Sequence, residues 1–370
     1  MATQSTVKKQ KITSLPIIFT LPSLNPDVRI QVFHDWEFHV HSVVLKLHSA
    51  LFRKFLDSAD KVHDNAVEPS VSGSIVKQGS WGGAKPASGG CFRYEWVTQI
   101  DDDGNGWYLA EKSKALAEKQ EMSHYKGRQI IEKNTFETML KAIYSENEPH
   151  AGATLDELER LTAMADYYGA LRVVSRAVDV GLLANSNLGP ELKLGLIEAT
   201  KLRNKALFQD SLILCLGPWS KPSFNDGGLE DHPNLFAVAK AAHATICVRL
   251  ASVHHQMLNY ASTEFNALHS TITEAKSIGD ELVSAANRAR MVAADDYVQL
   301  PLYYYFLSYS NTISSHVDKE EAYISPLLVN DMLLDKRANA GQKGFLDYFL
   351  IKHADGDEYE FPWDTKETVW

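Results

Sequence analysis

Four histidines lie close together near the start of the chain, and histidine is a common ligand for zinc and other transition metals. His39 and His41 are two residues apart, so on an extended strand their side chains point to the same side. His34 and His48 flank this pair. No nearby thiolate or carboxylate completes a plausible ligand set, and we therefore predict no metal site here.

The remaining chemically capable side chains do not form a recognisable catalytic motif. The sequence contains no GxSxG, no P-loop, no GxGxxG after a strand and no HExxH. Cys215 and Cys247 fall on apolar faces of expected helices, where thiols are usually unreactive. With Cys91 they make three widely spaced cysteines without a CxxC pair, which indicates neither a disulfide framework nor a structural zinc site.

We therefore expect a protein that is not an enzyme and that needs no cofactor. The competing hypothesis places an enzyme site in the C-terminal helices. The candidate acid and base groups for this enzyme site are His243, His254, His255 and Glu264.

The segment "DDDGNG" resembles a calcium-binding loop. Asp101, Asp103 and Asn105 have suitable spacing, but the bidentate acid required about seven residues further along is missing. The segment also lies between two expected strands rather than two helices. We predict a hairpin turn.

Composition limits the class of protein further. The 370 residues are 45% hydrophobic with a formal net charge of -10, which suits one or two globular domains and disfavours binding nucleic acid or anionic membrane along an extended surface. The apolar stretch 298–307 is far shorter than the roughly 20 residues that a membrane span needs. Two prolines interrupt the short apolar run at 12–24, so we expect an intracellular protein, cytoplasmic or nuclear, that is not secreted.

The segment 27–57 changes its hydrophobic period from two residues to three or four. Alternation predicts two strands at 27–33 and 36–41, separated by His34 and Asp35 in a turn of undetermined type. A helix at 42–48 follows, and Ser49 is expected to cap a second helix.

The middle of the chain predicts an insertion, a second hairpin and three helices. Residues 59–90 are rich in Ser, Gly, Ala and Pro and suggest an exposed or mobile insertion, after which 91–100 and 107–112 alternate like paired strands. Two capping boxes predict helix starts, Asn134 with Glu137 and Thr154 with Glu157. Gly169 is expected to end the second of these helices, and a third follows at 171–182.

Beyond Pro190 the periodicity becomes helical. We expect one or two helices up to Gly217, then a long Ala-rich helical region, and finally an acidic, aromatic and loosely held tail. The residues expected to be buried in the Ala-rich region are Leu235, Val238, Ala242, Ile246, Val253 and Met257.

The order of these elements, together with five residue landmarks, resembles the BTB/POZ domain. The resemblance covers residues 26–183. The landmarks are Asp27 in "PDVRIQVF"; Phe38 and His41 ahead of Val44 and Leu45; Ser49, Phe52 and Phe55; Leu140, Ile143 and Tyr144 in "MLKAIYS"; and Leu161, Ala165, Asp166, Tyr168, Gly169 and Leu171 in "LTAMADYYGALRVV".

The resemblance implies an α+β fold, in which a small sheet is capped by a helical cluster and is followed by an all-α region. The connection at 59–133 is much longer than the family pattern, and "YEWVTQIDDDG" looks like the fungal branch of the family. The expected organisation is an N-terminal extension at 1–25, a BTB/POZ domain at 26–185 with the insertion at 59–133, a helical domain at 186–350 and an acidic tail at 351–370.

The function that the resemblance implies is binding to other proteins, through self-association and in some members through cullin-3 ubiquitin ligases. Tyr144 and Glu146 in "YSENE" fit a short apolar-x-acidic cullin signature, although the same residues also fit a helix that ends in an exposed polar loop. Asp27 and His41 complete the candidate partner-binding residues. A transcriptional or signalling scaffold is the alternative, and the segment before Pro26 fits either an exchanged strand or an intramolecular edge strand.

Overall fold

The computed structural model divides the chain into two compact units and describes most of their residues. Unit 1 comprises Met1–Asn147 and Ala163–Val174, and unit 2 comprises Glu148–Thr162 and Ser175–Trp370. The α+β class expected from the sequence is confirmed. Cys91, Glu146 and the expected insertion at 59–90 lie outside the described residues, as do the side chains of 260–278. The described ranges are 15–56, 92–112, 122–144, 154–179, 183, 192–267, 272–294, 296–309, 324–352 and 361–367.

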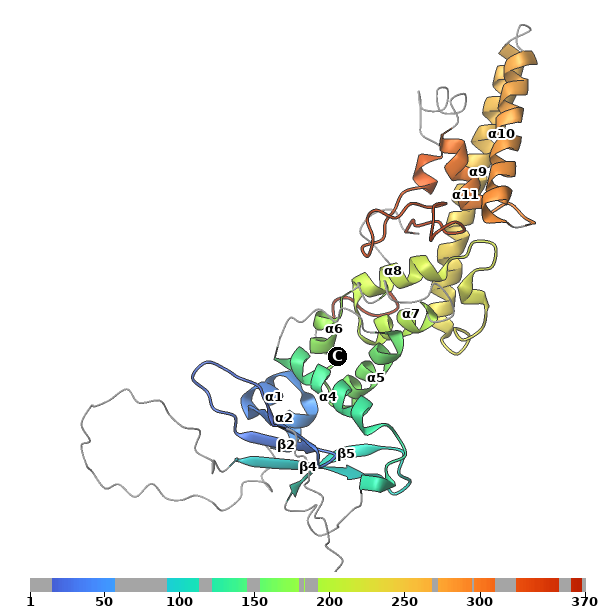
Figure 1. Ribbon diagram of the computed structural model, residues 1–370. Coiled ribbons are helices and arrows are strands. Elements are labelled where there is room, and N and C mark those ends of the chain that lie inside the picture. The colour runs from blue at the N-terminus through green and yellow to red at the C-terminus, as the bar shows by residue number, and fades with distance from the viewer. Residues whose placement is uncertain are drawn as a thin grey trace, which may run out of the picture. The chain divides into compact units, whose positions relative to one another are not determined.

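Unit 1 is built on a five-stranded sheet of order β1-β3-β2-β4-β5 (Figure 1). The hairpin of β2 with β3 and that of β4 with β5 are antiparallel, whereas β1 pairs with β3 and β2 with β4 in parallel. Both predicted hairpins are thus confirmed, and the segment before Pro26 supplies an intramolecular edge strand. The strands are β1 (Ile17–Ile18), β2 (Val28–Val32), β3 (Trp36–Val40), β4 (Tyr94–Ile100) and β5 (Trp107–Glu111).

The first hairpin turns through two residues with positive φ. Phe33 has φ 47° and His34 has φ 64°, so the turn begins one residue before the expected His34 and Asp35. A bulky residue rarely adopts this conformation. Phe33 is held there because its N–H donates to Thr98 Oγ1 at 3.1 Å and its buried ring contacts Trp107 and Tyr125.

The helices of unit 1 cover the sheet and fill its core with aromatic rings. Ser49 precedes the second helix, and its Oγ accepts from the N–H of Phe52 at 3.2 Å, which confirms the predicted cap. The rings of Phe52 and Tyr168 stack with centroids 5.4 Å apart, and Phe136 contacts Tyr168 edge to face. The helices and helical turns that lie wholly in unit 1 are α1 (Ser42–His48), α2 (Ala50–Leu56), η2 (Met122–His124) and α4 (Gln129–Ile143). Unit 1 also includes the end of α5 (Leu155–Tyr167) and the start of α6 (Leu171–Ala177), and the rest of these two helices belongs to unit 2.

One of the two predicted capping boxes is wrong. Helix α4 begins at Gln129, so Asn134 lies inside the helix, and Glu137 pairs with Lys133 and Lys141 on the same helix face. In the predicted capping box the Glu137 carboxylate would accept a backbone hydrogen bond at the helix start, whereas here it forms (i, i+4) ion pairs with the two lysines.

The second capping box is confirmed at the start of α5. The N–H of Thr154 donates to Glu157 Oε2 at 2.9 Å, and the N–H of Glu157 donates to Thr154 Oγ1 at 3.3 Å. The helix ends at Tyr167, and Gly169, with φ 61°, lies in the turn that stops it, as predicted.

Unit 2 is helical in its described part. Helices α7 and α8 pack together, and the long helices α9 and α10 lie side by side (Figure 1). Of the predicted core residues of α9, four are buried and two, Val238 and Met257, are half-buried. The elements are α7 (Leu192–Lys201), α8 (Lys205–Cys215), η4 (Ser223–Asn225), α9 (Pro233–Ala267), α10 (Ile272–Ala293), α11 (Leu300–Ser308) and η5 (Ser325–Leu327).

Two C-terminal segments pack on α8, and one of them, 361–367, is the described part of the tail that was expected to be loosely held. Asp210 is fully buried, and its carboxylate accepts from the N–H groups of Leu333 and Leu334 at 2.7–3.0 Å. Further along, the rings of Phe361 and Trp363 contact the buried ring of Phe208. Phe361 and Trp363 are half-buried, so these ring contacts hold the first part of 361–367 against α8, while 364–367 are exposed.

Helix α9 contains the one described segment that is long and apolar enough to cross a membrane. This segment is Pro233–Asn259; an 18-residue window within it has a mean hydropathy of 1.3, and 28% of that window is buried. Its apolar character was not anticipated from the sequence, where the stretch at 298–307 stood out instead. Length and composition alone also suit a core helix of a soluble protein.

Candidate functional site

Three of the four candidate partner-binding residues meet in one hydrogen-bonded cluster of unit 1. The N–H of His41 donates to the hydroxyl of Tyr144 at 2.7 Å, and the same hydroxyl lies 3.0 Å from His41 Nδ1. His41 Nε2 lies 3.2 Å from the carbonyl oxygen of Leu24. Next in the chain, Ser42 donates from its N–H and its hydroxyl to the carboxylate of Asp27, at 2.7 and 2.6 Å.

One arrangement of protons that satisfies this cluster uses the Tyr144 hydroxyl both as acceptor and as donor. If the Tyr144 hydroxyl accepts from the His41 N–H and donates to Nδ1, then Nε2 carries the proton that goes to Leu24. The imidazole is fully buried and connects three segments through its contacts with Tyr144 and Leu24. Asp27 caps the N-terminus of α1 in the way that acidic residues stabilise helix starts.

The cluster therefore has a structural role at the junction of sheet and helices. Asp27 and His41 direct their polar atoms to neighbours inside the unit, and the ring of Tyr144 also packs against Phe19, with centroids 4.6 Å apart. Glu146, the acidic half of the cullin-type signature, is outside the described residues.

Next to the cluster, unit 1 exposes several large apolar side chains. Val43 and Leu47, one turn apart on α1, are 56% and 67% exposed. Leu24, whose carbonyl is bound by His41, is 47% exposed, and Ile18 on the edge strand β1 is 54% exposed. We call Val43 and Leu47 the α1 surface.

The histidines considered as metal ligands have other partners. His39 Nε2 lies 2.6 Å from Glu37 Oε1 and its ring contacts Phe92, while His41 belongs to the cluster above. His34 occupies the hairpin turn. Within the described ranges, no group of three His, Cys, Asp or Glu side chains is placed to hold a metal ion.

The candidate acid and base groups of the C-terminal helices are not brought together. His243 stacks on Trp219 with ring centroids 4.3 Å apart, and burial lowers its pKa. His254 lies eleven residues further along α9, about 16 Å along the helix axis, where its Nε2 is 2.7 Å from the Tyr304 hydroxyl. His255 lies beside Asn259 at 3.0 Å, and the side chain of Glu264 is outside the described part.

The two described cysteines are weak nucleophiles. Burial raises the pKa of Cys215 to about 12, and burial also raises the pKa of Cys247. Cys247 Sγ lies 3.6 Å from His243 Nδ1 on the same helix. A raised pKa keeps both thiols protonated at neutral pH, which disfavours nucleophilic catalysis.

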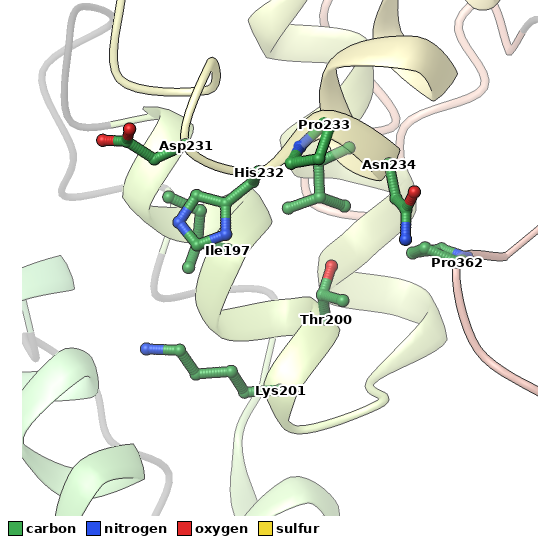
Figure 2. A pocket seen from close by; sticks show the side chains of 9 residues that line it. Ile197, Thr200, Lys201, Asp231, His232, Pro233, Asn234 and Pro362 are labelled. Carbon is green, nitrogen blue, oxygen red and sulfur yellow. The ribbon is translucent and has the colours of Figure 1, made fainter.

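A small open pocket of about 260 Å³ lies in unit 2 at the start of α9 (Figure 2). Asp231, His232, Pro233 and Asn234 line one side, and Thr200 and Lys201 lie opposite. Thr200 donates its hydroxyl to the carbonyl of Leu196, and Lys201 pairs with Glu198 at 2.7 Å. The lining combines apolar side chains with Asp231 and Lys201. The Thr200 hydroxyl is directed to the backbone and not to His232, as a nucleophile would be.

A second pocket, also of about 260 Å³, is mainly apolar and lies in unit 1 beside the edge strand β5. The sequence did not indicate it, because its walls come from three distant parts of the chain. One sequence signal for this pocket was available. In "DYYG" two tyrosines are adjacent at the end of a helix, so both cannot face the core and one of them must be exposed. The lining residues are Leu51, Phe55, Trp96, Tyr108, Leu109, Ala110, Glu111, Tyr167 and Tyr168.

Comparison of the chain with protein-family models, with curated protein sequences and with solved structures finds no match.

Proposed function

We propose that the chain is a protein-interaction adaptor or scaffold built on a BTB/POZ-type domain at 26–185. The support for this family is the way its sequence landmarks contact one another. Ser49 donates its hydroxyl to the carbonyl of Tyr168 at 2.5 Å, and the next residue, Ala50, donates its N–H to the carbonyl of Gly169 at 3.1 Å. Together with the bond between His41 and Tyr144, these contacts join four of the five landmarks.

The observation that carries the function is the exposed α1 surface. Val43 and Leu47 expose two aliphatic side chains one helical turn apart, and adjacent exposed apolar groups of this kind are found in protein interfaces. The occupant that we propose is a second copy of the chain, because Val43 and Leu47 of two molecules can face each other across a two-fold axis and cover each other.

Sedimentation of the full chain over a range of concentrations tests self-association. We expect a concentration-dependent rise in mass that is lost in Val43→Glu and in Leu47→Glu. Ile130→Glu is the matched control, because Ile130 is also aliphatic and 51% exposed on unit 1 but lies on α4. A single monomeric species at every concentration would contradict self-association, and equal effects of all three variants would remove α1 as its site.

The more specific proposal is a substrate adaptor of a cullin-3 ubiquitin ligase. Calorimetric titration of the full chain with the cullin-3 N-terminal region tests it. We expect saturable binding that weakens in Glu146→Ala, while Tyr144→Phe keeps the aromatic ring and the binding. Absence of heat at tens of micromolar protein would exclude cullin-3 and leave the transcriptional or signalling scaffold as the working function.

A catalytic role for the C-terminal helices is less favoured. The three histidines of α9 contact different residues: His243 contacts Trp219, His254 contacts Tyr304 and His255 contacts Asn259. None of the three lines either of the two pockets described above. Acid-base catalysis needs such groups within hydrogen-bonding reach of one substrate.

A further inference from the structure

One tyrosine of the pocket in unit 1 has a hydroxyl group that makes no hydrogen bond with the described residues. Tyr168 lines the pocket although it is only 2% exposed. Its carbonyl oxygen accepts from the Ser49 hydroxyl and from the N–H of Leu51, and its N–H donates to the carbonyl of Met164. Its hydroxyl, in contrast, has no partner within the described ranges.

Two other tyrosines of unit 1 do have a partner for this group. The hydroxyl of Tyr94 donates to the carbonyl of Leu56 at 3.2 Å. The hydroxyl of Tyr108 donates to Gln99 Oε1 at 2.9 Å. A buried hydroxyl without a partner is unfavourable, because the group gives up its hydrogen bonds to water and gains none in return. The Tyr168 hydroxyl therefore calls for a partner from outside the chain.

The ring contacts of Tyr168 indicate which part of this side chain reaches the pocket. Phe52 stacks on the ring with centroids 5.4 Å apart. Phe136 and Tyr167 contact it edge to face, with centroids 5.6 and 5.1 Å away. These three rings cover its apolar surface, which leaves the hydroxyl end to face the pocket.

The other walls of the pocket are mainly apolar. Leu51 and Phe55 come from α2, and Trp96 comes from β4. Leu109 of β5 pairs with the buried Thr98 of β4. Paired residues of neighbouring strands lie on the same face of a sheet, so the side chain of Leu109 lies on the covered face.

The size and the charge of the pocket limit the ligand. Its volume of about 260 Å³ lies just below the roughly 300–1,000 Å³ of pockets for drug-sized molecules, which indicates a compound with a single ring. None of the lining residues, all of which are described, is Lys, Arg or His, so a negatively charged ligand would find no opposite charge. Aromatic walls favour an aromatic ligand, because rings pack well edge to face or offset.

The Tyr168 hydroxyl is suited to be a hydrogen-bond donor. Burial raises the pKa of Tyr168 well above the ordinary value of 10.0, so the hydroxyl keeps its proton at neutral pH. A carbonyl oxygen of a ligand can accept this hydrogen bond without bringing a charge into the pocket.

The geometry points to a binding site for an uncharged, single-ring aromatic compound that carries a carbonyl group, with its ring between the apolar walls and its oxygen accepting a hydrogen bond from the Tyr168 hydroxyl. This site is separate from the α1 surface and does not rest on the proposed BTB/POZ function.

Two fluorinated probes of nearly the same shape test the ligand class. 4-Fluoroacetophenone has the carbonyl oxygen, and 1-ethyl-4-fluorobenzene lacks it. Both are titrated with the full chain and followed by fluorine NMR. We expect saturable binding of the ketone, with a dissociation constant in the millimolar range or tighter. The hydrocarbon should bind about fivefold more weakly or worse, because it leaves the Tyr168 hydroxyl without a partner.

Tyr168→Phe tests the hydrogen bond itself. It should weaken binding of the ketone by about fivefold or more and leave binding of the hydrocarbon unchanged, so that the two probes bind this variant about equally. The variant should also unfold in urea at the same midpoint as the unmodified chain or at a higher one, because the lost hydroxyl has no partner among the described residues.

Leu109→Trp tests the location. The larger side chain should fill the pocket and weaken binding of both probes by about tenfold or more. Leu258→Trp is the matched control, because Leu258 is 70% exposed on α9 in unit 2, and it should leave binding of both probes unchanged. Circular dichroism checks that each variant is folded.

Four results would overturn the proposal. The first is no saturable binding of the ketone up to its solubility limit. The second is equal binding of ketone and hydrocarbon to the unmodified chain, which would mean apolar partition alone. The third is a clearly lower urea midpoint of Tyr168→Phe, which would show that the hydroxyl is already bound inside the chain. The fourth is an equal effect of Leu109→Trp and Leu258→Trp, which would place the bound probe outside the pocket.

Discussion

His41 and Tyr144 are 103 positions apart in the chain, and they share two contacts through one hydroxyl group, at 2.7 Å to the N–H of His41 and at 3.0 Å to its Nδ1. This pair joins the end of β3 to the end of α4. Because the imidazole is fully buried, each of its polar atoms needs a partner inside the unit.

Removing this hydroxyl should destabilise unit 1. Tyr144→Phe leaves the buried N–H and Nδ1 of His41 without a partner, which costs about 1–3 kcal/mol. Urea unfolding should show a lower midpoint. Tyr167→Phe serves as the control, because the Tyr167 side chain is largely exposed, and equal midpoints for the two variants would contradict the structural role of the pair.

Gly169 should tolerate no side chain. It has φ 61°, and a Cβ placed there would lie 2.8 Å from the Cβ of Ala50. Gly227 also has positive φ, at 82°, but a Cβ there meets nothing within 4 Å. Gly227→Ala should therefore lose about 1 kcal/mol through backbone strain alone, and Gly169→Ala should lose clearly more in thermal or urea unfolding. Equal losses would show that α2 is not packed against Gly169.

Two glutamates should respond to pH in opposite directions. Burial raises the pKa of Glu198, although Lys201 and Thr162 partly offset this, so its ionised form costs stability that grows as the pH rises above the ordinary value of 4.5. Burial acts in the same direction on Glu137, but Lys133 and Lys141 lower its pKa overall, so its contribution is present above 4.5 and is lost as the pH falls through the folded pKa.

Unfolding of the two glutamine variants at neutral pH and near pH 4 tests these signs. Relative to the unmodified chain, Glu198→Gln should be more favourable at neutral pH than in acid. Glu137→Gln should be more damaging at neutral pH than in acid. The same sign for both variants would contradict the assigned environments.

The aromatic residues of the C-terminal segment should contribute more stability than its ion pair. Trp363 contacts the buried Phe208 ring at 5.2 Å, and we expect Trp363→Ala to cost about 1–2 kcal/mol. Glu367 pairs with Arg203 at 2.7 Å but is 47% exposed, so Glu367→Gln should cost no more than about 0.5 kcal/mol. A reversed order in urea unfolding would mean that residues 361–367 are held by charge.

Local signals predicted the elements of unit 1 better than its contacts. Alternation placed β2 and β3 correctly because Val28, Ile30 and Val32 are all fully buried on one face. The capping box of Thr154 and Glu157 was predicted correctly because the two residues are only three positions apart in the sequence. The Asn134 box failed because the same local pattern also occurs inside a helix, where Glu137 has lysines one turn away on either side.

Contacts between distant segments could not be predicted from single residues. The sequence of the acidic tail did not indicate that Phe361 and Trp363 contact Phe208. Which aromatic rings pack together depends on the three-dimensional fold and not on the local sequence. The cluster of Asp27, His41 and Tyr144 was approached only through the resemblance to a family, and the pocket at β5 was not anticipated at all.

Hydrogen-deuterium exchange of the full chain, compared between dilute and concentrated solution, tests the central claim most directly. If unit 1 self-associates through the α1 surface, the amides of Ser42–His48 should become more protected at high concentration, while those of Gln129–Ile143 should not change. Protection that is independent of concentration, or that appears on α4 instead of α1, would contradict the proposed interface.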